Sequence, residues 1–365
     1  MIRRLNQWRK AIWRIAKWPV RIAGLILLLL LMPVGYVELA CRGDAAEQTY
    51  QPLITDAAFQ RGEANTYLTY PEWHIVYAYD GLAEALKTGD EHAFDYISSV
   101  NGFWSSTCAL MRVADAHGGA DFDTRSMIHT IGVSFTVEMA AKAAYEETIG
   151  HATAWIRGRE KTPEDKAIAA MAIEYAAFLR QTPWYQFPFT REIDELWSTP
   201  TRSVVRGWER RFGIGLEFAA KAAYARVIGG AVAATAPAKL TIRSVIKGMT
   251  AASLRSIPEV TVIGARGDGL EIETPRYDLF TRILVAIAAR GGTIQEIAGN
   301  DDIMITLTAP AGADIRLPRG TVLHRMKRDG FASDRLLVEV KVPELAAFLR
   351  DHPLGDPGLE HVFDY

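Results

Sequence analysis

The sequence lacks the short motifs that identify common enzyme classes. Its 365 residues contain no C-x-x-C-H haem motif, no Walker loop, no G-x-S-x-G nucleophile elbow and no H-E-x-x-H zinc motif. The Glu-x-x-His spacing that di-iron helical bundles repeat is absent as well. These absences remove the corresponding chemistries as starting hypotheses. We therefore predict no cofactor and leave open whether the protein is an enzyme.

Cysteine is almost absent, with Cys41 and Cys108 as its two occurrences. The pair allows at most one disulfide, which in an oxidising compartment would tie the segment around Cys41 to the folded body. Spacing alone leaves two free thiols equally open. Acylation of Cys41 is a minor alternative, because Glu38 and Leu39 replace the small and aliphatic residues that a lipoprotein site prefers.

Acidic side chains are scarce at the N-terminus, where residues 1–42 hold eight Lys or Arg and one acid, Glu38. Seven of the basic residues precede an uncharged run from Ile22 to Val37. This order predicts a basic cytoplasmic or interfacial segment over 1–21 and a single-pass transmembrane helix over 22–40. By the positive-inside rule the N-terminus is cytoplasmic and the body lies outside the inner (plasma) membrane, as a periplasmic domain.

A cleaved signal peptide is the alternative for this region. Its cleavage site would need a small residue two positions before Ala40, where Glu38 stands. We therefore favour a retained membrane anchor.

The charge of the body argues against a nucleic-acid partner. The chain has a net charge of −2, and residues 1–42 carry +7, so the remaining residues carry −9 by subtraction. A nucleic-acid-binding body would be expected to have a basic face.

Composition and residue patterning divide the body into three parts. They predict an α+β multidomain protein. Residues 41–66 are polar and weakly patterned, which is typical of a linker. Residues 67–235 are rich in alanine and carry helix-start signals such as Thr162-Pro163, which predicts a helical domain. Residues 236–365 hold β-branched runs between Gly, Asn and Asp turns, which predicts an α+β domain.

The C-terminal part has a recognisable order of elements. Strands are expected at 260–263, 270–274, 293–297, 303–308, 336–342 and 359–363, and helices at 276–290 and 343–351. This order resembles the split-βαβ plan of ferredoxin-like domains.

One segment of the helical part is nearly repeated. The sequence VEMAAKAAYEETIG at 137–150 matches LEFAAKAAYARVIG at 216–229 in nine of fourteen positions. Similarity at a fixed offset predicts an internal duplication of the helical domain.

Each copy of the repeat places Glu, Lys and Tyr on one helical stripe between apolar residues. A solvated Glu-Lys pair would need no apolar neighbours, so we expect partial burial. The six side chains that we expect to meet across a helix pair, or to line one polar pocket, are Glu138, Lys142, Tyr145, Glu217, Lys221 and Tyr224. The favoured interpretation is a polar lock that specifies packing, because ion-pair networks often have no chemical role.

Aromatic residues crowd the segment 67–77. Tyr70, Trp73 and Tyr77 fall on one helical stripe beside His74. Such a stripe more often belongs to a core. As a ligand-binding site it would form an apolar wall suited to a lipid-like or aromatic molecule.

Histidine offers a weak metal hypothesis. Glu147 and His151, four residues apart, can place two metal ligands on one helix face. His129 lies 22 residues before His151, about 33 Å along a straight helix, so it joins them only if the helix breaks. Capping and surface roles are the simpler interpretation.

Together these features favour an accessory or assembly factor that acts by contact with a membrane or periplasmic protein. One alternative is an envelope enzyme, such as a metal-assisted hydrolase using His74, His129, Glu147 or His151. The weaker alternative is a lipid or hydrophobic-ligand binding protein that uses the aromatic stripe. In each case we expect the lipid bilayer as a partner.

Overall fold

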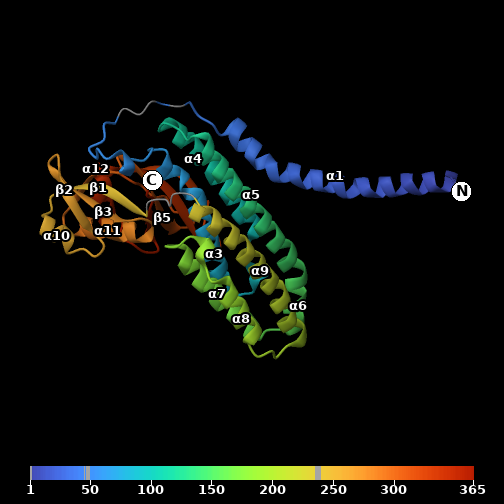
Figure 1. Cartoon of the computed structure of the whole chain (residues 1–365). Helices are drawn as coiled ribbons and strands as arrows, with labels where there is room; N and C mark the ends of the chain where they lie inside the picture. Colours follow the sequence, from blue (N-terminus) through green and yellow to red (C-terminus); the bar gives the residue numbers. More distant parts are fainter. Residues whose placement is uncertain (1, 45, 47–49, 235–239) are drawn as a thin grey trace.

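The chain forms a long N-terminal helix, a helical bundle and two antiparallel sheets (Figure 1). The computed structural model describes residues 2–44, 46, 50–234 and 240–365, with the backbone alone for 2–16 and 231–234. The helices are α1 (Ile2–Ala40), α2 (Asn65–Leu68), α3 (Tyr70–Thr88), α4 (Tyr96–Ala116), α5 (Phe122–Tyr145), α6 (His151–Arg157), α7 (Pro163–Leu179), α8 (Phe189–Ser198), α9 (Val204–Ala234), α10 (Ala251–Arg255), α11 (Asp278–Ala289) and α12 (Val342–Asp351). The short 3-10 or π turns are η1 (Ala57–Phe59), η2 (Glu91–Ala93), η3 (Glu146–Gly150) and η4 (Trp184–Gln186). The strands are β1 (Thr241–Lys247), β2 (Thr261–Arg266), β3 (Gly269–Pro275), β4 (Thr293–Ile297), β5 (Asp302–Pro310), β6 (Thr321–Lys327), β7 (Ser333–Lys341) and β8 (Gly358–Val362).

Helix α1 runs without a break through the two segments that the sequence separates at residue 21, and Pro19 and Pro33 lie inside it. Its portion Lys17–Ala40, 24 residues long, is long and apolar enough to cross a membrane, a property that an N-terminal signal sequence shares. That length corresponds to about 36 Å, against roughly 30 Å for a hydrocarbon core. Only 6% of its apolar window is buried by the protein, and Figure 1 shows α1 extending away from the body.

The C-terminal end of α1 is fastened to the bundle. Cys41 forms a disulfide with Cys108 of α4. Arg42 donates to both carboxylate oxygens of Asp115, at 2.7 and 2.9 Å. Val37 is buried. The last turn of α1 is therefore a structural part of the body.

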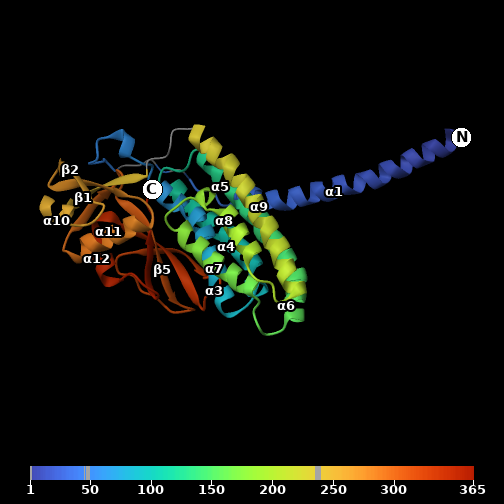
Figure 2. The same ribbon diagram turned by 60° about the horizontal axis from the view of Figure 1, so that its bottom comes forward.

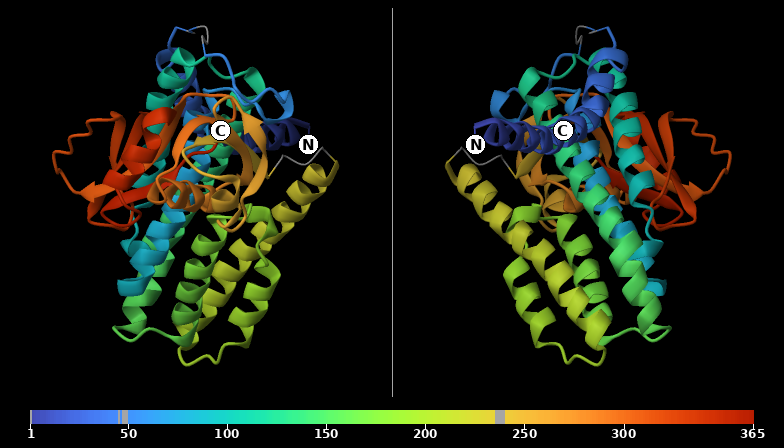
Figure 3. Two further views of the ribbon diagram at one scale, coloured as in Figure 1. Left: turned by 90° about the vertical axis from the view of Figure 1, so that its left-hand side faces the viewer. Right: turned by 90° about the vertical axis from the view of Figure 1, so that its right-hand side faces the viewer.

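Local caps determine where the bundle helices begin. Helix α7 starts with a capping box between Thr162 and Asp165 and with Pro163 in its first turn, as its sequence indicates. Asp121 is the N-cap of helix α5, and its carboxylate accepts a hydrogen bond from the amide of Thr124. Helices α5 and α9 run in opposite directions along the bundle (Figures 2 and 3).

The C-terminal region contains two four-stranded sheets, ordered β2-β3-β1-β4 and β6-β7-β5-β8. Numbered within each sheet, both read second, third, first, fourth, and every pairing is antiparallel. Strands β1 and β6 and helix α10 were not expected. In β1 the buried Ser244 interrupts the apolar alternation, and in the edge strand β6 most side chains are at least partly exposed.

Helices α11 and α12 join the two sheets in a reciprocal way. Helix α11 follows β3 of the first sheet and contacts β8 of the second, whereas α12 follows β7 of the second sheet and contacts β4 of the first. The two helices also pack on each other, so both sheets share one apolar core.

Helix α3 lies close to the second sheet, and a glycine permits this approach. A Cβ atom at Gly81 would overlap the backbone of Asp329 in the turn between β6 and β7. Tyr70 and Trp73 of α3 pack against Phe363, with ring centres 5.7 and 6.1 Å apart. The bundle and the second sheet therefore form one continuous core.

The segment 41–66, expected as a linker, packs on the body in much of its described part. The Glu296 carboxylate of β4 accepts hydrogen bonds from the Tyr50 hydroxyl and from the amides of Leu53 and Ile54. Ile54 is buried. Because two of these contacts use backbone amides, side-chain composition does not reveal them.

Candidate functional site

Two ion pairs between the repeated segments join α5 to α9. Glu138 pairs with Lys221 at 2.7 Å, and Lys142 pairs with Glu217 at 2.7 Å. Positions 138 and 217 are equivalent in the repeat, as are 142 and 221, so the second pair is the first with the helices exchanged. Reciprocal contacts of this kind are typical of two-fold symmetry. Four of the six side chains expected to meet thus lie together.

The two tyrosines of the repeat have separate environments. Tyr145 donates a hydrogen bond to the carboxylate of Glu209. Tyr224 is 47% exposed and packs on Trp184, with ring centres 5.3 Å apart. The reciprocal relation is therefore limited to the charged residues.

Lys221 is the centre of this cluster. Its ammonium group donates to the Tyr79 hydroxyl at 2.6 Å and lies 4.7 and 5.1 Å from the ring centres of Tyr79 and Tyr175. Burial alone would lower the pKa of Lys221, but Glu138 and its other partners raise it well above its ordinary value. Burial would raise the pKa of Glu217, but the two lysines lower it to about 2. Lys221 and Glu217 are therefore both charged at neutral pH.

A cavity of about 660 Å³ adjoins the cluster, between α3, α5, α7, η4 and α9. Small-molecule sites commonly have volumes of about 300–1,000 Å³. Most of its wall is apolar, and its aromatic rings include Trp73, Phe135, Tyr175, Trp184, Tyr224 and Tyr277. The charged residues in its lining are Glu72, Glu138 and Lys221.

Glu72 brings a carboxylate to the cavity that has no hydrogen bond or ion pair among the residues described. Its side chain is exposed, and it lines the cavity. Glu72 precedes Tyr79 by seven residues, about 10 Å along α3. The polar groups of the cavity are thus spread along this helix.

Of the aromatic stripe expected to bind a ligand, only Trp73 lines the cavity. Tyr70, His74 and Tyr77 are buried in the core. His74 donates from Nε2 to the Ser99 carbonyl at 2.9 Å, and burial lowers the pKa of His74 to about 4. Trp73 is buried in the same core as well, so the core interpretation describes all four residues of the stripe, and Trp73 also lines the cavity.

The cavity uses a neighbouring stripe of α3 that sequence reasoning missed. Glu72, Val76 and Tyr79 recur at spacings of four and three residues, which is a helical periodicity. The other walls, such as Tyr175 and Trp184, come from segments about a hundred residues away. Spacing could have identified the α3 stripe but not its partners.

A second charged cluster is wholly buried and was also missed. Arg206 and Arg210 have no exposed surface. Arg206 pairs with Asp165 at 2.8 Å and with Glu91 at 3.0 Å, and Arg210 pairs with Glu146 at 3.0 Å. Glu146 begins the π turn η3 that joins α5 to α6. These pairs connect α9 to three other elements, η2, η3 and α7, and the cluster is structural in character.

Two groups of acidic side chains in the described part of the chain lie close enough to hold a metal ion. They are Glu63 with Asp301 and Asp302, and Asp90 with Glu91 and Asp165. Lys341 pairs with Asp302 at 2.6 Å, and Arg157 pairs with Asp90 and Asp165 at 2.8 and 2.7 Å. Cationic side chains therefore already neutralise carboxylates of both groups.

The histidines of the metal hypothesis lie apart. Glu147 is exposed in η3, and His151 is exposed and stacks on His92 with ring centres 4.3 Å apart. Neither Glu147 nor His151 belongs to the two acidic groups. His129 pairs with Glu38 of α1 at 2.7 Å. His74 is in the core, so the four residues proposed for hydrolysis do not converge.

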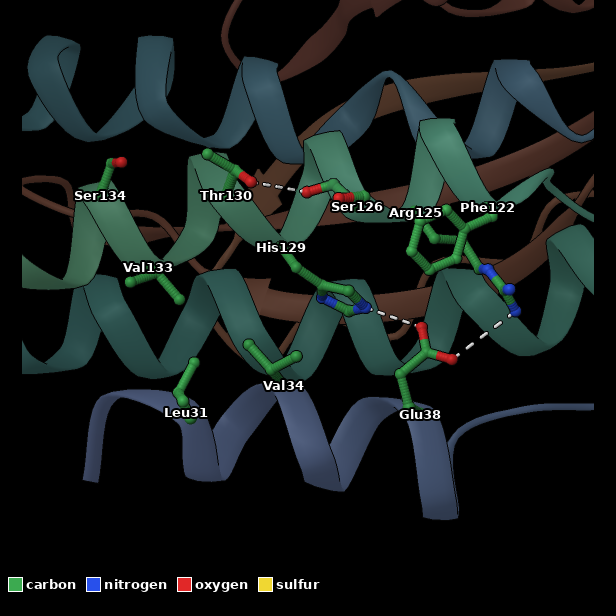
Figure 4. A pocket seen from close by; sticks show the side chains of 10 residues that line it. All are labelled: Leu31, Val34, Glu38, Phe122, Arg125, Ser126, His129, Thr130, Val133 and Ser134. Carbon is green, nitrogen blue, oxygen red and sulfur yellow. Dashed lines mark hydrogen bonds and ion pairs between the residues drawn. The ribbon is translucent and has the colours of Figure 1, made fainter. Parts of the chain in front are cut away.

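A groove of about 510 Å³ lies between α1 and α5 (Figure 4). Leu31, Val34 and Glu38 form its α1 side. Figure 4 shows Arg125 and His129 reaching from α5 toward Glu38, at 3.6 and 2.7 Å. The end of the apolar helix therefore borders a partly polar space on the body.

The cavity combines apolar walls with a few polar groups, an arrangement suited to reversible binding of a molecule with an apolar body. No family model, curated protein or solved structure matches this chain. The function is therefore argued from the geometry of the site.

Proposed function

We propose that this protein is a membrane-anchored binding protein whose cavity between α3, α5, α7, η4 and α9 holds a molecule with an apolar body. The lining of the cavity carries the proposal: about 660 Å³ of mostly aliphatic and aromatic wall with three charged residues. Removing apolar surface from water is worth about 25 cal/mol per Å². A ligand with an apolar chain or ring system gains that energy here.

Native mass spectrometry of the full-length protein tests this function with dodecanol as the probe. Wild type is expected to bind dodecanol in a saturable manner. Ile131 lines the cavity, so Ile131→Trp should lower the affinity roughly tenfold, because overpacking costs about 1–3 kcal/mol. Val137, on the same helix and 46% exposed, lies outside the lining. Val137→Trp is therefore the matched control, and equal binding by all three proteins would contradict the proposal.

The anchor is proposed to be retained, with a cytoplasmic N-terminus and a body outside the inner (plasma) membrane. The basic residues ahead of the apolar span support this orientation. The Cys41–Cys108 disulfide supports an oxidising compartment. Cleavage near Ala40 would remove Val37 and Glu38, which pack on the body or pair with it. Protease added to intact spheroplasts should digest the body, and protection of the body would contradict this topology.

A second candidate function is contact with a membrane or periplasmic protein, as an accessory or assembly factor. It is supported by an exposed aromatic patch on α8 and α9. Trp197, Trp208 and Phe212 are 41%, 43% and 61% exposed, and their ring centres lie 5.6–6.0 Å apart. The Arg211 guanidinium lies 5.5 Å from the Trp208 ring centre. Aromatic residues and arginine dominate the energetics of many protein interfaces.

Affinity purification from solubilised membranes tests this second function. A partner protein recovered with wild type should be lost with Trp208→Ala. Recovery of the full-length protein alone would count against a contact role.

The sheets and the bundle are further proposed to be built from repeated units. The strand order and the antiparallel pairings of each sheet support two tandem ferredoxin-like units. In the second unit the loop 311–320 stands where the first has α10. The reciprocal ion pairs of Glu138 and Lys142 support a duplication of the α5 and α9 segments.

A further inference from the structure

The groove beside α1 and the cavity behind α5 share part of their lining. Ser126, Thr130 and Ser134 border both spaces. They recur every four residues, all three are exposed, and their side chains are small. Figure 4 shows them on the side of α5 turned away from α1. A low polar ridge therefore separates the end of the membrane helix from the aromatic cavity.

Two nitrogen atoms at the groove are shielded from solvent and have no hydrogen-bond partner, Nε of Arg125 and Nδ1 of His129. Leaving a buried N–H donor unpaired is unfavourable, so a ligand that supplies an acceptor to Nε of Arg125 is favoured at this place. Leu31 and Val34 of α1 give the same groove an apolar wall. The groove thus offers a donor for a head group beside a surface for a hydrocarbon chain.

We propose that a single-chain membrane lipid lies across this ridge, with its head group at Arg125 and His129 and its acyl chain in the cavity. The proposal rests on the proposed binding function and adds the ligand class and its source, the leaflet around α1. The head group carries acceptor oxygens, such as those of a phosphate, because Arg125 Nε is a donor. The charged lining of the cavity, Glu72, Glu138 and Lys221, has a net negative charge. The chain rather than an anionic head group therefore occupies the cavity.

Photolabelling of the full-length protein in vesicles of phosphatidylethanolamine and phosphatidylglycerol tests this binding mode. The probe is a single-chain phospholipid with a diazirine near the end of its acyl chain. Label is expected on peptides of the cavity wall that contain Tyr175 or Trp184. Arg125→Met should lower this labelling about tenfold, because it removes a charge-assisted hydrogen bond. Arg112→Met is the matched control, since Arg112 contacts the Ala40 carbonyl and lies outside the groove.

A second variant separates the route from the cavity itself. Val133 lines the groove and not the cavity. Val133→Trp should therefore lower photolabelling of the cavity while dodecanol binding stays at the wild-type level. Wild-type labelling in both Arg125→Met and Val133→Trp would overturn the lipid proposal and leave the cavity function standing. Failure of wild type to bind dodecanol would overturn the cavity function as well.

Discussion

Replacing Lys221 by methionine tests whether the charged cluster between α5 and α9 stabilises the bundle. Methionine keeps much of the side chain's length and apolar surface and removes its charge. Glu138 then loses its ion pair at 2.7 Å, while Glu217 keeps Lys142. Removing one partner of a buried pair costs about 3–5 kcal/mol. Lys221 is 13% exposed and Glu138 is 30% exposed, so we expect the lower end, about 3 kcal/mol.

Thermal unfolding of the full-length protein in detergent measures this loss. A cost of about 3 kcal/mol corresponds to a melting temperature lower by about 6–12 °C for a unit of 150–250 residues. Lys87 is the matched control, because it pairs with Glu84 at 2.6 Å but is 52% exposed. Lys87→Met should cost less than about 1 kcal/mol. Equal melting temperatures for Lys221→Met and Lys87→Met would refute the reasoning.

Three further predictions concern stability. Reducing the disulfide between Cys41 and Cys108, which closes a separation of 67 residues, should cost about 4 kcal/mol, and an unchanged denaturation midpoint would contradict this. Burial lowers the pKa of His361 from 6.5 to about 3, so its contribution to stability is present above pH 6.5 and lost as the pH falls toward 3. His361→Phe should therefore flatten the pH dependence of the free energy of unfolding between these pH values. An unaltered pH profile would argue against this prediction. Gly81→Ala should lower the free energy of unfolding by about 1–3 kcal/mol, because the added methyl group overlaps the turn between β6 and β7. Gly230 lies in open space, so Gly230→Ala should not lower it. Equal melting temperatures for the two variants would exclude the overlap.

Part of the charged cluster could be predicted from the sequence, because the repeat places Glu and Lys at the same helical spacing in both copies. Two antiparallel helices with the same Glu-to-Lys spacing can exchange partners, and this is how Glu138, Lys142, Glu217 and Lys221 pair. The tyrosines differ because their surroundings come from outside the repeat. A carboxylate lies beside Tyr145, whereas an indole ring lies beside Tyr224.

The cavity and the edge strands could not be predicted in the same way. The cavity is the volume that the side chains of five elements leave unfilled, and no local sequence pattern indicates that volume. Strand β6 is an edge strand with exposed side chains, so it lacks the buried apolar runs that mark β5 and β7. The fully buried Arg206 and Arg210 pair with the neighbouring Glu209 but also with carboxylates distant in the sequence, such as Glu91. Tertiary packing, rather than local propensity, determines all three.

The central claim is that the cavity binds a molecule with an apolar body. Identifying the molecule that stays bound when the protein is extracted from its native membrane tests this claim most directly. Full-length wild type and Ile131→Trp are extracted in a mild detergent, and bound molecules are identified by native mass spectrometry after dissociation. We predict a single-chain lipid in a stoichiometric amount on wild type and its loss from Ile131→Trp. The same mixture of membrane lipids on both proteins, in proportion to their abundance, would contradict a binding function for the cavity.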